Sequence, residues 1–198
     1  MNEFLLYFKL GLNHVLDINA YDHVLFFIAL MIPYGFKDIK NILILVTIFT
    51  IGHTSSLILS VFNIFTLSSD LVEFLIPLSI LLTAIYYMYI VRHNIKHPNN
   101  TIIRLITLAF GTIHGLGFSN YFKAILPGNT TDKLLPLLEF ALGIEAAQVV
   151  VVILVLIIGV FAHKILKFNT RDWALTLAVF VIGVVTPMLI QSEIWINE

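Results

Sequence analysis

Residues 149–162 read VVVVILVLIIGVFA, an unbroken apolar run inside a longer hydrophobic segment that extends from residue 134 to residue 162. A helix needs roughly 20 mainly apolar residues to cross the hydrocarbon core of a bilayer, and this segment exceeds that length. Across the 198 residues, 59% are hydrophobic and only 12% are charged. Soluble domains are about 25% charged. The chain is therefore predicted to be an integral membrane protein.

Five further apolar segments complete the predicted architecture. We expect an all-α, single membrane domain over residues 1–198, with six transmembrane helices at roughly 21–35, 41–63, 71–91, 102–120, 134–162 and 172–191. The stretch 4–16 is apolar but interrupted by Lys9 and Gly11, and it is too short to cross. It is predicted to form an interfacial or re-entrant helix.

Basic residues are distributed unevenly around these spans. One side is predicted to hold Lys37, Lys40, Arg92, Lys96, Arg104, Lys164, Lys167 and Arg171. The other side holds only Lys9, Lys123 and Lys133. Because cytoplasmic loops carry an excess of lysine and arginine, the first side is predicted to be cytoplasmic, which places both termini outside.

Several ionisable residues fall inside the predicted spans or at their outer boundary. Such side chains are costly in a bilayer and are by default a functional hypothesis. Judged by depth, the candidate metal ligands in the outer half are His14, Asp22, His23, His53, His114 and Glu145. Asp17, Glu73, Glu139 and Gln148 are candidates for a second layer that orients those ligands.

The available donor atoms restrict the chemistry of such a site. The chain has no cysteine, so a metal must be held by nitrogen and oxygen donors. Histidines with carboxylates suit a divalent transition metal such as nickel, cobalt or zinc. Gly52, Gly111 and Gly115 accompany the deep histidines, and small residues let membrane helices approach closely. Membrane lipid and a metal ion are the expected partners. The net charge of −1 suggests no nucleic-acid partner, and the oligomeric state stays open.

Five motifs give a more specific indication. They are His14 followed by Asp22-His23, FTIGHTSS at 49–56, VEFLIPLSI at 72–80, FGTIHGLGF at 110–118 and LGIEAAQ at 142–148. Together they resemble the HupE/UreJ family of bacterial membrane proteins, and most closely the branch that carries His-Gly-Leu-Gly-Phe. Permease members have five residues between the first histidine and Asp-His, whereas this chain has seven.

The resemblance implies a function. The family is associated with nickel or cobalt uptake, which implies a secondary permease for a divalent transition metal, nickel or cobalt, in the bacterial inner (cytoplasmic) membrane. His14, Asp22, His23 and His114 occupy the positions that match the metal-associated motifs of the family.

Other classes of function remain open at this point. The inner halves of the spans, such as residues 149–161, offer almost no ligands for an exit path. A one-sided site also suits an intramembrane metalloenzyme, in which a metal-activated water hydrolyses a lipid or peptide bond and Glu145 or Glu73 is the general base. A haem-b electron carrier with His53 and His114 as axial ligands is a third hypothesis. An accessory or scaffold role is a fourth.

Overall fold

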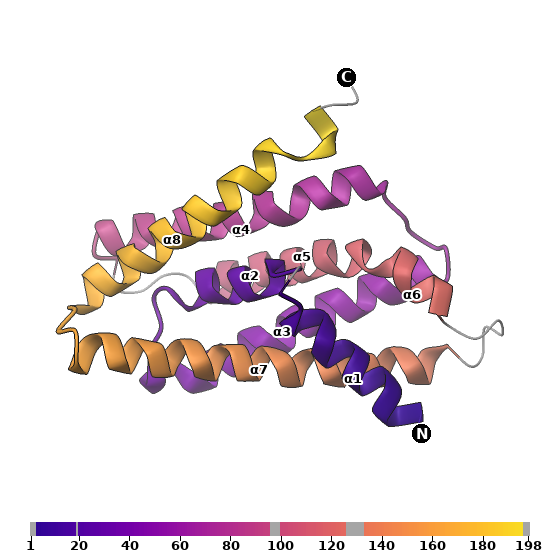
Figure 1. Cartoon of the computed structure of the whole chain (residues 1–198), viewed down its shortest axis with the longest axis horizontal. Helices are drawn as coiled ribbons and strands as arrows, with labels where there is room; N and C mark the ends of the chain where they lie inside the picture. The colour runs from indigo at the N-terminus through magenta and orange to yellow at the C-terminus, as the bar shows by residue number, and fades with distance from the viewer. Residues whose placement is uncertain (1–2, 19, 96–99, 126–132, 196–198) are drawn as a thin grey trace.

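The computed structural model describes residues 3–18, 20–95, 100–125 and 133–195, and the regular elements in these ranges are all helical (Figure 1). The helices are α1 (Glu3–Leu16), α2 (Asp22–Met31), α3 (Ile39–Val61), α4 (Ser69–Arg92), α5 (Asn100–Gly117), α6 (Ser119–Ile125), α7 (Leu134–Lys164) and α8 (Thr170–Ile190), with short 3-10 turns η1 (Phe36–Asp38) and η3 (Glu193–Trp195). The predicted all-α class is confirmed.

Four helical segments are long and apolar enough to cross a membrane: η1 with α3, α4, α7 and α8. α5 and α6 form a fifth candidate as a bent pair, with 48° between them. These five correspond to the predicted spans 41–63, 71–91, 102–120, 134–162 and 172–191. The chain is thus a multi-pass membrane protein, and the count of six depends on how α1 and α2 are embedded.

α2 is shorter than the predicted span 21–35. It ends at Met31 because Pro33 follows, and proline has no backbone N–H with which to continue the helical hydrogen bonds. Its ten residues extend about 15 Å, which is roughly half of the hydrocarbon core. In Figure 1, α1 runs inward from the N-terminal end to the middle of the bundle, and α2 continues from there toward the opposite end.

α1 packs closely along the first part of α7. A Cβ atom added at Gly11 would meet the carbonyl oxygen of Phe140, and one added at Gly143 would meet that of Phe8. These two glycines allow the helix backbones to touch. α1 therefore lies against a membrane-spanning helix, where it carries its last turn into the bundle.

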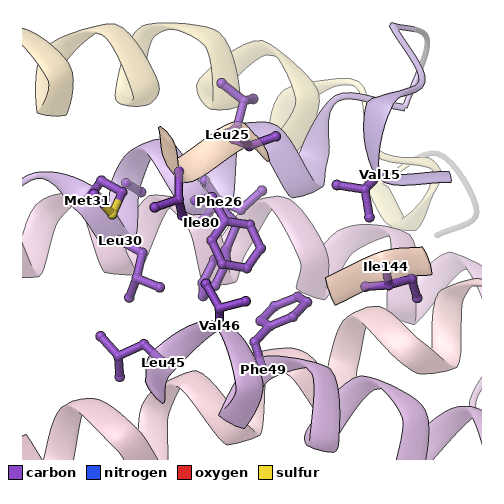
Figure 2. Packing of buried hydrophobic residues seen from close by; sticks show 14 of the residues in the cluster. Val15, Leu25, Phe26, Leu30, Met31, Leu45, Val46, Phe49, Ile80 and Ile144 are labelled. Atoms are coloured by element: carbon purple, nitrogen blue, oxygen red, sulfur yellow. The ribbon is translucent and has the colours of Figure 1, made fainter. Parts of the chain in front are cut away.

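α2 lies at the centre of the bundle, in contact with α4, α7 and α8. Figure 2 shows Phe26 and Leu30 of α2 directed toward Val46 and Phe49 of α3. Phe26 and Phe49 are fully buried, with ring centroids 4.9 Å apart. This packing holds the N-terminal turn of α2, and hence His23, in the interior.

One end of the bundle carries most of the basic side chains from which the orientation was predicted. At this end α2, α4 and α7 end, and α3, α5 and α8 begin. This surface, called the basic end below, carries Lys37, Lys40, Arg92, Arg104, Lys164, Lys167 and Arg171. Lys96 lies outside the described residues. The side of the membrane that the basic end faces stays a prediction.

Candidate metal centre

Three histidines from three helices converge inside the bundle. His14 lies in the last turn of α1, His23 is the second residue of α2, and His53 lies in the middle of α3. One ring nitrogen from each lies within 4.8 Å of the others. A tetrahedral metal ion with bonds of 2.0–2.1 Å spaces its ligands about 3.4 Å apart. A small contraction of this group, called the histidine triad below, would bring its nitrogens into the coordination range of one ion.

His114 of α5 extends the cluster. Its ring centroid lies 5.1 Å from that of His23, and it is 1% exposed. Its Nδ1 lies 2.8 Å from the carbonyl oxygen of Phe110. Because a carbonyl only accepts, Nδ1 carries the proton and Nε2 presents a lone pair. His114 is thus a fourth potential ligand, outside the triad but beside it.

Asp22 fixes the neighbouring imidazole in a similar way. Its Oδ1 lies 3.2 Å from Nδ1 of His23 and accepts the backbone N–H of His23 at 2.9 Å. The carboxylate holds a proton on Nδ1 and leaves Nε2 of His23 free. Metal-binding histidines commonly have their second nitrogen held by a carboxylate in this manner.

Most of the remaining ring nitrogens of the cluster lack hydrogen-bond partners within the described part of the chain. Nε2 of His14, His23, His53 and His114 is buried there without a hydrogen-bond partner, and Nδ1 of His53 is too. Buried polar atoms are nearly always paired, so a group of unpaired ones needs an explanation. Neutral imidazoles are suitable ligands for nickel, cobalt and zinc, and a bound cation would satisfy these lone pairs.

Phenylalanines enclose the cluster, and sequence reasoning did not place them in the site. The ring centroid of Phe118 lies 3.9 Å from that of His14, Phe140 lies 5.7 Å from His14, and Phe49 lies 5.2 Å from His114. Phe49 lies four residues before His53, and Phe118 lies four residues after His114. Residues four apart share one face of a helix, so this spacing could have indicated from the sequence that both phenylalanines lie beside the histidines. The break between α5 and α6 falls at Phe118.

The structure places Glu145 away from the triad. Its Oε1 accepts a hydrogen bond from the hydroxyl of Thr47 at 2.6 Å, between α7 and α3. One turn further along α7, Gln148 accepts from Thr50 at 2.9 Å and is fully buried. Glu145 and Gln148 thus form a polar seam between α3 and α7. Any role of Glu145 as a metal ligand stays a prediction.

The three other predicted carboxylates are dispersed. Glu139 is buried on α7, where its side chain is 8% exposed. Glu73 is exposed near the start of α4. Asp17 is exposed in the connection between α1 and α2. None of them belongs to the triad, and their proposed role as orienting groups stays untested.

Fold and site together define a multi-pass helical membrane protein with a buried cluster of histidines. A family model described as HupE / UreJ protein matches residues 1–193, so the chain belongs to the HupE/UreJ family. No curated protein and no solved structure matches the chain. The placement in the branch with the His-Gly-Leu-Gly-Phe motif stays a prediction.

Proposed function

We propose that this protein is a secondary permease for a divalent transition metal, nickel or cobalt, and that the ion in transit binds at the histidine triad. The observation that carries the proposal is the convergence of three ring nitrogens within 4.8 Å, from three different helices. The family's association with nickel and cobalt transport supports the choice of metal. Asp22 and the carbonyl of Phe110 would keep two Nε2 lone pairs directed at the ion.

Alternating access requires that the site open to each side in turn. His23 and His53 are 1% and 0% exposed, so the structure corresponds to a closed arrangement. α2 is short, central and bounded on both sides by non-helical residues. We propose that displacement of α2 moves His23 relative to His53 and opens the site. The outer side is assigned to the N-terminal end, and the membrane to the bacterial cytoplasmic membrane.

Two alternatives receive less support. A metalloenzyme needs a general base next to the metal, but Glu145 is bonded to Thr47 in the seam and Glu73 is exposed on α4. A haem carrier needs room for a porphyrin between His53 and His114. The fully buried Phe49 packs against both rings, so protein fills this space.

The first test is metal content and transport in purified protein. Wild type, His53→Ala and the matched control His93→Ala are titrated with nickel, cobalt and zinc in detergent and analysed by mass spectrometry. His93 lies at the basic end, where its ring packs against that of Tyr89 at a centroid distance of 4.3 Å, outside the cluster. We expect near-stoichiometric metal in wild type and in the control. In His53→Ala one of three ligands is lost, so binding should weaken by at least the roughly 10–100-fold that loss of an orienting partner costs.

Reconstitution into vesicles loaded with a metal-sensitive dye then separates the hypotheses. A permease accumulates the ion inside, and His53→Ala abolishes accumulation while His93→Ala does not. Metal that binds tightly but never crosses would overturn the permease proposal in favour of an enzyme or a scaffold. Equal metal binding by wild type and His53→Ala would refute the site itself.

A further inference from the structure

A large cavity lies at the basic end, away from the histidine cluster. It has a volume of about 830 Å³ and is lined by the end of α2 with residues 32–38, the end of α4, the end of α7 and the start of α8. α7 and α8 are joined at this end and diverge away from it, while α8 packs along α4 (Figure 1). Val160 of α7, which lines the cavity, is 37% exposed, so this wall is reachable from outside.

The cavity presents unpaired positive charge. Lys37 and Arg171 line it, and both are exposed. Neither has an ion pair or a hydrogen bond within the ranges that the structure describes. The one carboxylate in the lining, Asp38, accepts the backbone N–H of Gly35 at 3.0 Å. The indole of Trp173 adds an N–H group beside Gly159.

The rest of the lining is apolar. Val155, Leu156 and Val160 supply it from α7, and Ile90 and Val91 supply it from α4. A cavity that combines two free cations with an aliphatic wall fits an amphiphilic anion. Basic pockets between membrane helices on the cytoplasmic side bind the head groups of anionic lipids.

We propose that this cavity binds one anionic phospholipid from the leaflet at the basic end. Its phosphate contacts Lys37 and Arg171, the indole N–H of Trp173 donates to the head group, and an acyl chain lies along the aliphatic residues of α7. Free phosphate would leave that apolar wall uncovered. A zwitterionic head group would bring its own ammonium beside two unpaired cations. The proposal is independent of the metal, because none of the histidines in the cluster lines the cavity.

The test uses the full-length protein with Trp195→Phe, which leaves Trp173 as its single tryptophan. Phosphatidylglycerol with brominated acyl chains is titrated in detergent, and bromine that reaches the cavity quenches the fluorescence of Trp173. Each lysine or arginine near a membrane surface contributes about 1 kcal/mol to anionic-lipid binding. We therefore expect Lys37→Gln with Arg171→Gln to weaken binding about thirtyfold. The matched control, Lys164→Gln with Lys167→Gln, removes the same charge outside the cavity lining and should change affinity less than threefold.

Four outcomes would overturn the proposal. They are the absence of quenching, equal affinity for brominated phosphatidylcholine, equal weakening by both double variants, and complete displacement of the lipid by inorganic phosphate at matched ionic strength. Gly159→Val provides a test without a charge change, because its side chain fills space beside Trp173. It should also weaken quenching, and unchanged quenching in that variant would place the lipid elsewhere.

Discussion

Asp22 and His23 are adjacent in the sequence, and their side chains lie within hydrogen-bonding distance of each other. A residue at the start of a helix is free to fold its side chain back, so Asp22 reaches both the backbone N–H and the ring of His23. The carboxylate selects the tautomer in which Nδ1 carries the proton, which leaves Nε2 of His23 without a partner. Asp22 is thus better placed to orient a ligand than to act as one.

Asp22→Asn should therefore weaken metal binding without abolishing it. The amide oxygen keeps an acceptor near Nδ1 of His23 but lacks the charge that strengthens Nε2 as a ligand. Loss of such a partner typically costs 10–100-fold in metal affinity. The measurement is nickel binding by calorimetry, with Asp70→Asn in the first turn of α4 as a control of equal charge change. Complete loss of binding would show that Asp22 is itself a ligand, and no change would show that its contact with His23 is incidental.

At the same scale, depth along the sequence predicted histidines that converge in the structure, but not which side of each helix faces the cluster. Phe140 of α7 packs against His14 and His53. Glu145 follows it by five residues, which at 100° per residue turns it roughly 140° away. It therefore meets Thr47 instead. Depth alone cannot supply this rotation, because it depends on how α7 packs against its neighbours.

At the scale of elements, long apolar runs predicted the bounds of the helices well, whereas short apolar runs predicted them poorly. α4, predicted at 71–91, covers Ser69–Arg92, because a run of that length has only one way to satisfy its backbone in lipid. α1 and α2 are individually too short for the same rule. Their placement depends on tertiary contacts, such as Gly11 against α7, that no local pattern encodes.

Glycines at the contact of α3 and α5 give a prediction about stability. A Cβ atom at Gly115 would meet the carbonyl oxygen of His53 and the hydroxyl of Ser56, and backbone cannot move aside. Gly115→Ala should therefore push α3 from α5 and destabilise the protein by about 1–3 kcal/mol. It should also lower metal affinity, because these helices carry His53 and His114. Thermal unfolding in detergent measures the first effect.

Gly183→Ala is the matched control, since nothing lies within 4 Å of the added carbon on α8. Alanine is better than glycine inside a helix by up to about 1 kcal/mol, so this variant should be neutral or slightly stabilising. If both variants shift the unfolding temperature equally, the close approach of α3 and α5 is not what Gly115 provides.

At the scale of the whole molecule, α1 and α2 together determine the topology. If they make one broken crossing, the number of crossings is even and both termini share a side, as the distribution of basic residues predicts. If α1 and α2 instead return to the side from which they enter, the N-terminus lies on the same side as the basic end. The two arrangements differ in which side of the membrane residue 3 faces.

The absence of native cysteine makes this difference directly measurable. Single variants Glu3→Cys, Ser68→Cys and Lys167→Cys are treated with a membrane-impermeant thiol reagent on intact cells. A broken crossing predicts that the first two, at the N-terminal end of the bundle, are labelled from outside, and that Lys167→Cys reacts only after permeabilisation. Labelling of Ser68→Cys but not Glu3→Cys would mean that α1 and α2 do not cross. That result would also contradict the packing of α1 along the first part of α7, at the end of the bundle opposite the basic end.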